Sequence, residues 1–288
     1  MPLAEDPPPH VGPRRISFAR LVGLCLAGCV ATLAACGVSQ DEEVAIGREN
    51  ARQIDAQLPL VTDPVATSYL SALGGDIARR TARADLEWQF RIVDSDQVNA
   101  FAVPGGFIYV NRGLIERAAT LDELAGVLGH EIAHVTLRHS ARQMEEGSKR
   151  GVVISLLCTL TSVCESSVGR VAVNAANSAL FARHSRHDEA EADSAAIENV
   201  MRADIDPDGI PSMFERLLQE RRTRPGPVEG WFASHPLEED RIARTRALIE
   251  RIEPAQLEGL RQDSPDFHAF RARIAALPRP PAVRALPP

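Results

Sequence analysis

The stretch TLDELAGVLGHEIAHV, residues 120–135, decides the fold class of this chain. Its apolar residues recur at helical spacing, and Thr120 with Glu123 matches the capping box that opens many helices. Apolar residues flank its polar centre on both sides, as a buried helix requires. We therefore predict a helix that runs from Thr120 to about Met144.

The helix carries HEIAH at residues 130–134, a pattern typical of a zinc site. His130 and His134 share one helical face with Cβ atoms roughly 5–6 Å apart, so both imidazoles reach one tetrahedral ion at about 2.0–2.1 Å. Glu131 is rotated towards the metal-bound water, where it serves as the general base. Zinc lowers the pKa of that water towards about 7 and polarises the scissile carbonyl. An isolated match also arises by chance on solvated helices, so a third ligand is needed.

We predict the third ligand within DEAEAD, residues 188–193. Glu189 and Asp193 share one face, so Glu189 binds the metal and Asp193 holds a ligating His by a hydrogen bond. Glu191 is turned roughly 200° away and faces solvent or another partner. An acidic, solvated helix face is the alternative. Two His and one Glu leave the fourth position open for water, and we expect one zinc ion (Zn2+) per chain.

Four motifs in order resemble the family of zinc metallopeptidases that includes the CAAX prenyl endopeptidases, HtpX and the Oma-type enzymes. They are NAFAVPGG at 99–106, HEIAH, EAEAD at 189–193, and SHP at 234–236 with Arg241 after it. The resemblance covers roughly residues 41–252. It implies an α+β, mainly helical, zincin-like fold with a small sheet whose edge strand binds the substrate.

The resemblance also implies further site residues. The substrate edge strand is expected at four consecutive residues: Phe107, Ile108, Tyr109 and Val110. In periplasmic relatives the His of the His-Pro motif occupies the open zinc position, so His235 is a candidate regulatory fourth ligand, and Arg241 is a candidate oxyanion stabiliser. From the residues alone, His235 fits a helix cap and Arg241 a surface side chain equally well. Three other His are not expected to bind the metal: His139, His184 and His187.

Residues 1–35 predict an export signal. Three basic residues, Arg14, Arg15 and Arg20, precede an apolar run at 21–35 that is short of the roughly 20 residues a spanning helix needs. An ordinary signal peptide or a membrane anchor is the alternative interpretation.

A lipid anchor is expected at the end of this signal. LAAC at 33–36 resembles the lipobox of bacterial lipoproteins, which places cleavage before Cys36 and lipidation on its thiol. The similar LAGC at 26–29 makes Cys29 the alternative. Gly37 follows Cys36, and the lack of an Asp there favours the outer membrane. We therefore expect a member of the periplasmic lipoprotein branch, anchored in the bacterial periplasm to the outer membrane.

The remaining chain is expected to hold one domain. A tether, the zinc metallopeptidase domain and a partly disordered C-terminal tail follow the signal peptide, at residues 36–40, 41–252 and 253–288. With 288 residues and 44% hydrophobic content, the chain is long enough for one medium-sized core. The apolar run at 151–163 fits a buried element better than a surface that dips into lipid. Cys158 and Cys164 fit a small-loop disulfide and buried free thiols equally well.

The charge pattern bears on the class of partner. The net charge is −7, and the positive charges are scattered Arg with a single Lys149. Nucleic-acid binding needs clustered basic residues, so no nucleic-acid partner is expected. The oligomeric state is not determined by the sequence.

Together these features predict a zinc-dependent endopeptidase of the bacterial envelope that cleaves misfolded or unassembled proteins, with Glu131 as general base. Its expected partners are such proteins and, through the lipid, the membrane. A zinc-stabilised chaperone or assembly factor of the outer membrane that binds without cutting is the alternative, and His235 locking the metal would favour it. A lipid-anchored structural protein with an accidental motif is a third interpretation.

Overall fold

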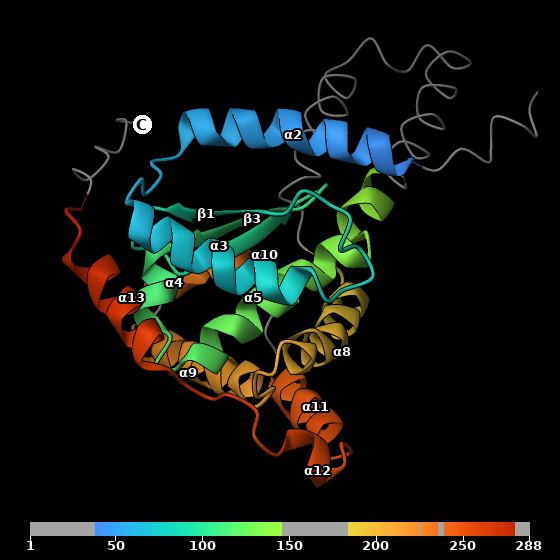
Figure 1. Cartoon of the computed structure of the whole chain (residues 1–288), viewed down its shortest axis with the longest axis vertical. Coiled ribbons are helices and arrows are strands. Elements are labelled where there is room, and N and C mark those ends of the chain that lie inside the picture. The colour runs from blue at the N-terminus through green and yellow to red at the C-terminus, as the bar shows by residue number, and fades with distance from the viewer. Residues whose placement is uncertain (1–37, 146–183, 225, 236–238, 280–288) are drawn as a thin grey trace, which may run out of the picture. The chain divides into compact units, whose positions relative to one another are not determined.

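The computed structural model describes residues 38–145, 184–224, 226–235 and 239–279 (Figure 1). The elements in chain order are α2 (Gln40–Gln57), α3 (Pro64–Ala78), β1 (Gln89–Val93), β2 (Ala100–Val103), β3 (Phe107–Asn111), α4 (Arg112–Arg117), α5 (Leu121–Thr136), α8 (Arg186–Arg202), α9 (Gly209–Thr223), η3 (Gly226–Val228), α10 (Glu229–Ser234), α11 (Glu239–Ile249), α12 (Pro254–Leu257) and α13 (Pro265–Ala276). The α+β, mainly helical class is confirmed. The signal segment, the lipidation site, the apolar run at 151–163 and its two Cys lie outside the described residues, so these remain predictions.

β3 lies in the middle of the sheet, which corrects the expected edge strand. The strand order is β1-β3-β2, with β1 parallel and β2 antiparallel to β3, and all five residues of β3 are buried. The prediction that Phe107 to Val110 form an edge is therefore wrong, and β1 and β2 are the edges. Gly105 and Gly106, with φ angles of 82° and 100°, turn β2 back against β3. β1 pairs with the opposite edge of β3. The local sequence does not predict this pairing.

The two faces of the sheet pack against different helices (Figure 1). Phe107 and Tyr109 of β3 pack with Ile54 of α2. Ile108 and Val110 point the other way, into the main core that α3 and α5 build. Alternation along the strand thus assigns one face to α2 and the opposite face to the helices that carry most of the core.

A close backbone contact and a buried ion-pair network hold α2 in place. A Cβ atom on Gly47 would lie 1.7 Å from the carbonyl oxygen of Pro104, so only glycine permits this approach. One turn earlier, the buried Glu43 carboxylate accepts hydrogen bonds from Arg83 Nη1 at 2.7 Å and Arg138 Nε at 2.8 Å. Arg83 also donates to a carbonyl in the last turn of α5 at 3.0 Å. The network therefore joins α2 to the end of α5.

α5 begins at the predicted place but ends earlier than expected. The side chain of Thr120 makes no capping hydrogen bond, so the predicted capping box is not formed. The helix ends at Thr136 rather than near Met144, because Arg138 has a left-handed φ of 57°. Residues 139–145 are helical again after this break.

The core continues past residue 252, where we expected the domain to end. α13 packs against α3 and α4 and buries Phe267, Phe270 and Ile274 in the main core. Residues 254–277 therefore belong to the folded domain, and the prediction that the tail begins at residue 253 is wrong. The spacing of these three apolar residues at i, i+3 and i+7 is the signal that a helix packs there.

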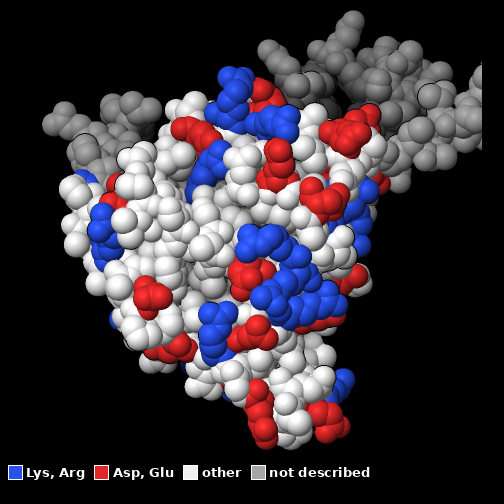
Figure 2. All heavy atoms as spheres, viewed as in Figure 1, with Lys and Arg blue, Asp and Glu red and all other residues white. Residues whose placement is uncertain are grey.

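Acidic and basic side chains lie side by side on the face shown in Figure 2. Some of them link elements, as Arg273 of α13 does with Asp63 at the start of α3, at 2.6 Å. Partly exposed pairs of this kind contribute about 0.2–1 kcal/mol each. Within the described part of the chain, every helix is too short or too polar to cross a bilayer.

We expect Gly47→Ala to destabilise the fold by about 1–3 kcal/mol, the usual cost of overpacking, because the new methyl group meets the Pro104 carbonyl. Chemical denaturation measures the change in the free energy of unfolding. Gly226→Ala is the matched control, since no atom of the described residues lies within 4 Å of a Cβ atom there. Equal stability of the Gly47 variant and the wild type would contradict the close seating of α2.

Candidate metal centre

The three predicted ligands meet in the core between α5 and α8. His130, His134 and Glu189 are all buried. The Nε2 atoms of the two His lie 3.0 Å apart. Glu189 places Oε2 at 3.5 Å from the His130 Nε2 atom and Oε1 at 3.5 Å from that of His134. Three ligand atoms from two helices therefore surround one small volume.

Small residues let the two helices approach closely enough for this. A Cβ atom on Gly129 of α5 would lie 3.4 Å from the Ala196 carbonyl oxygen of α8. Asn199 Nδ2 donates to the Gly129 carbonyl at 3.2 Å. Ala192 and Ala196 are fully buried at the contact. Short side chains such as Glu and His can then bridge from one helix to the other.

Asp193 lies one helical turn after Glu189 on α8, and this position places it beside His130. Its Oδ1 atom is 3.0 Å from His130 Nδ1. This contact favours a proton on Nδ1, so Nε2 is the ring nitrogen that is available to a cation.

Arg241 of α11 is 2% exposed, so its interpretation as a surface residue is wrong. Its Nε and Nη2 atoms donate to Asp193 at 2.8 and 2.6 Å, and Nη1 lies 2.6 Å from Glu189 Oε2. Arg241 does not line the cavity described below. These contacts favour a role in positioning the two carboxylates over the expected role as oxyanion stabiliser.

His139 and Glu191 extend the hydrogen-bond network of the site beyond the metal ligands. We did not predict this extension from the sequence. His134 Nδ1 is 2.7 Å from His139 Nδ1, and His139 Nε2 is 3.3 Å from Glu191 Oε2. Burial lowers the pKa of His139, so the ring is neutral near pH 7 and carries one proton. With that proton donated from Nε2 to Glu191, Nδ1 accepts the His134 Nδ1–H, and His134 Nε2 keeps its lone pair for a cation.

His235 is the fourth member of the cluster. Its Nδ1 atom lies 3.2 Å from Glu189 Oε1 and 3.4 Å from His130 Nε2. The backbone N–H of His235 donates to the Trp231 carbonyl at 2.8 Å, and the Trp231 ring stacks on the imidazole with centroids 4.6 Å apart. Its position at the end of α10 is therefore fixed by both backbone and ring contacts.

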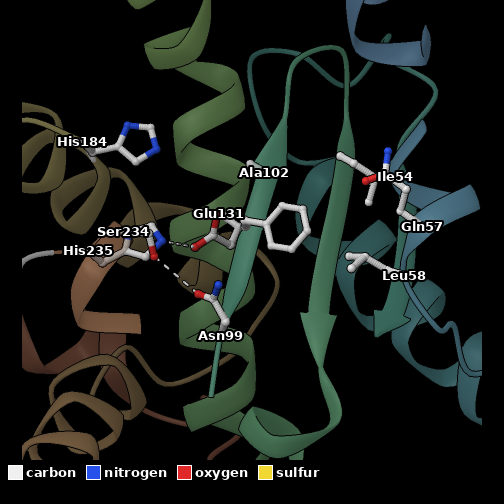
Figure 3. A pocket seen from close by; sticks show the side chains of 10 residues that line it. Ile54, Gln57, Leu58, Asn99, Ala102, Glu131, His184, Ser234 and His235 are labelled. Atoms are coloured by element: carbon white, nitrogen blue, oxygen red, sulfur yellow. Dashed lines mark hydrogen bonds and ion pairs between the residues drawn. The ribbon is translucent and has the colours of Figure 1, made fainter. Parts of the chain in front are cut away.

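Glu131 borders a cavity of about 290 Å³ (Figure 3). Its carboxylate is buried and neither oxygen has a hydrogen-bond partner among the described residues. The nearest ion-pair contact is His235 Nε2, 3.4 Å from Oε1. Burial raises the pKa of the Glu131 carboxyl, while the nearby His235 and His130 oppose the shift. A carboxylate in this setting is suited to take up a proton and release it again.

The cluster fits a divalent cation. Ligand atoms around a tetrahedral zinc ion with bonds of about 2.0–2.1 Å lie roughly 3.3–3.4 Å apart, and His130, His134, Glu189 and His235 offer atoms that all lie within 4.8 Å of one another. Burial lowers the pKa of His130, but the Asp193 and Glu189 carboxylates outweigh burial and raise it to about 9. The site therefore attracts positive charge, which a divalent cation supplies.

An HExxH helix, a carboxylate on the neighbouring helix and a Glu at the adjoining cavity define the catalytic centre of a metallopeptidase. The model of peptidase family M48 matches residues 64–249, more than half of the chain. The chain belongs to this family and is a metalloendopeptidase of the Oma type, as the motifs predicted.

Curated relatives agree with this assignment. The chain is 32% identical to the beta-barrel assembly-enhancing protease of Yersinia pestis over 231 residues, which are 78% of this chain and 47% of the relative. It is 28% identical to the mitochondrial metalloendopeptidase OMA1 of Schizosaccharomyces pombe over 202 residues, 70% of this chain and 57% of the relative. The chain thus spans about half the length of these relatives.

We expect His139→Ala to weaken zinc binding about 10–100-fold, because His134 loses the acceptor that fixes its tautomer. Competition with a chromophoric chelator measures the affinity without recourse to activity. His268→Ala is the matched control, since that ring is exposed and pairs with Asp263. Unchanged zinc affinity in the His139 variant would refute its positioning role.

Proposed function

We propose that this chain is a zinc-dependent endopeptidase of the bacterial envelope that hydrolyses peptide bonds of misfolded or unassembled proteins. The observation that carries the proposal is the convergence of His130, His134 and Glu189 beside a cavity that Glu131 borders. The donor set of two imidazoles and one carboxylate suits zinc, which when bound lowers the pKa of a water molecule and polarises the scissile carbonyl.

Residues of this chain transfer the proton and position the metal ligands. Glu131 accepts the proton of the attacking water and passes it to the leaving amine, as its raised pKa favours. Asp193 holds the His130 ring, and His139 holds that of His134. Arg241 keeps Glu189 in place by an ion pair at 2.6 Å. Preorganisation of this kind is how buried sites avoid reorganisation during the reaction.

The extended substrate is proposed to lie along β2, which replaces the strand predicted from the sequence. β2 is an edge strand, and Phe101 and Ala102 of β2 line the same cavity as Glu131. A peptide added as a strand satisfies its backbone polar groups without demanding one sequence. This mode suits substrates whose chain is unfolded.

The cellular setting is proposed from two separate observations. The lipobox-like segment supports a lipid anchor at Cys36, and several relatives are named for enhancing β-barrel assembly. We place the protein in the periplasm at the outer membrane, acting on unassembled envelope proteins. Detection of the acylated N-terminal peptide by mass spectrometry tests the anchor.

A second function, a zinc-stabilised chaperone or assembly factor that does not cut, is favoured by one observation. The Nδ1 atom of His235 lies within reach of the position that an attacking water needs, 3.2 Å from Glu189 and 3.4 Å from His130. A His in this place would supply a fourth ligand to a bound cation. We propose instead that His235 reversibly blocks the fourth metal position of a protease. Substitution of His235 distinguishes this protease from a protein that does not cut.

We expect Glu131→Gln to lower the cleavage of an unfolded protein such as casein by about 10²–10⁴-fold, because the amide cannot accept the proton. Zinc content, measured by atomic emission, is expected to stay near one per chain. Glu258→Gln, on an exposed residue, is the control and should cut like the wild type. Full activity of the Glu131 variant would refute the mechanism.

We expect His235→Ala to cut casein at least as fast as the wild type, because the fourth position is then open to water. The initial rate of peptide release measures this with zinc content as the control for an intact site. A variant that keeps its zinc but cuts nothing, together with an inactive wild type, would establish the non-cleaving function instead.

A further inference from the structure

We propose that Ile54 of α2, Leu58 directly after this helix, and Phe101 of β2 form an apolar subsite that selects an apolar side chain next to the scissile bond. This inference rests on the proposed peptidase function and names its specificity. It assigns a role in substrate choice to α2, which precedes residues 64–249, the part that the family model matches.

The cavity beside Glu131 has two chemically different ends. One end holds the polar groups of the catalytic centre, Glu131 and His235, and the other is walled by Ile54, Leu58 and Phe101, with the exposed Gln57 beside them. Figure 3 shows the α2 side chains and those of the catalytic centre on opposite sides of β2. A single cavity therefore has lining residues from both the catalytic centre and the α2 side of the sheet.

The register of β2 places a substrate side chain in the apolar end. The N–H of Asn111 in β3 donates to the Asn99 carbonyl at 2.9 Å. Peptide groups alternate in direction along an antiparallel strand, so those of Ala100 and Ala102 point to the opposite edge, where a substrate strand adds. The substrate residue beside Phe101 then shares the Phe101 face, towards α2, and its neighbours share the face towards Glu131.

The chemistry of this end suits an apolar side chain. Asp55, the nearest acidic residue on α2, already pairs with Arg91 at 2.8 Å and with the Tyr109 hydroxyl at 2.8 Å. A charged substrate side chain would lose its hydration there without gaining an ion pair. A cavity of roughly 150 Å³ holds benzene, and the whole cavity of about 290 Å³, of which the apolar end is one part, is large enough to admit a substrate side chain.

The elements that line the apolar end of the cavity are held in place without substrate. Gly47 seats α2 against the Pro104 carbonyl, and Glu43 ties it to Arg83 and Arg138. On the sheet side, the Phe101 ring stacks on Tyr109 with centroids 4.9 Å apart. A rigid pocket discriminates between side chains better than a mobile one, because no binding energy is spent on ordering it.

The test maps cleavage sites in a denatured protein by mass spectrometry, using the full zinc-loaded chain and two variants. Leu58→Arg places a cation in the subsite, and Leu58→Ala enlarges it in case the first variant fails to fold. Ile46→Arg is the matched control, because Ile46 lies on α2, the helix that Leu58 follows, but is 38% exposed and does not line the cavity.

We expect the wild type and the Ile46 variant to cut where one position next to the bond is Leu, Phe, Met, Ile or Val. Leu58→Arg should lower kcat/KM for such a peptide about tenfold, the scale on which apolar pockets discriminate, and shift cutting towards acidic side chains. A wild type that cuts without side-chain preference, or a preference unchanged in both Leu58 variants, overturns the subsite alone. A wild type and a His235→Ala variant that are both zinc-loaded and both cut nothing overturn the proposed function and the subsite with it.

Discussion

The close contact between α5 and α8 is the constraint on which the rest of the structure depends. His and Glu side chains are short, so a cation site shared by two helices exists only where their backbones nearly touch. Gly129 faces the Ala196 carbonyl at this point, and Asn199 fixes the contact by a hydrogen bond to the Gly129 carbonyl. A Cβ atom at position 129 would lie 2.9 Å from a methyl carbon of Val200, so a larger residue there would have to displace α8 side chains at the contact.

That contact brings several buried charges together. Residues of opposite charge on the surrounding elements form ion pairs with them. Arg241 of α11 pairs with Glu189 and Asp193, and its guanidinium lies over the Phe214 ring at 4.8 Å. Beyond the ligands, at the C-terminal end of α5, Glu43 is paired with Arg83 and with a second Arg. Removing one partner of such a pair typically costs about 3–5 kcal/mol, because the other charge stays buried. Ion pairs on neighbouring elements thus surround the C-terminal half of the catalytic helix.

The sheet and α2 form the part of the site where we propose that substrate binds. The cavity is shared by β2, α2 and the end of α10, three elements that are far apart in the sequence. One strand edge thereby adjoins both the general base and the apolar wall. The same framework serves two purposes, since the contacts that seat α2 against the sheet also shape the region where a substrate lies.

Sequence patterns predicted the ligand pairs well because both are local. His130 with His134, and Glu189 with Asp193, are each fixed by helical geometry alone, and the structure brings the two pairs together. His139 was passed over because it follows a break at Arg138 that periodicity does not reveal. The edge strand was misplaced because strand order depends on which segment pairs with β3 from outside the hairpin.

The sequence by itself determined the chemistry: the ligand types, their spacing and the helices that carry them, since a period of 3.6 residues sets which side chains share a face. Only the tertiary structure decided which strand is the free edge, that Arg241 faces two carboxylates, and that α2 walls the cavity. These depend on contacts between distant segments, and the free energy of such contacts is a property of the packed core rather than of any local stretch.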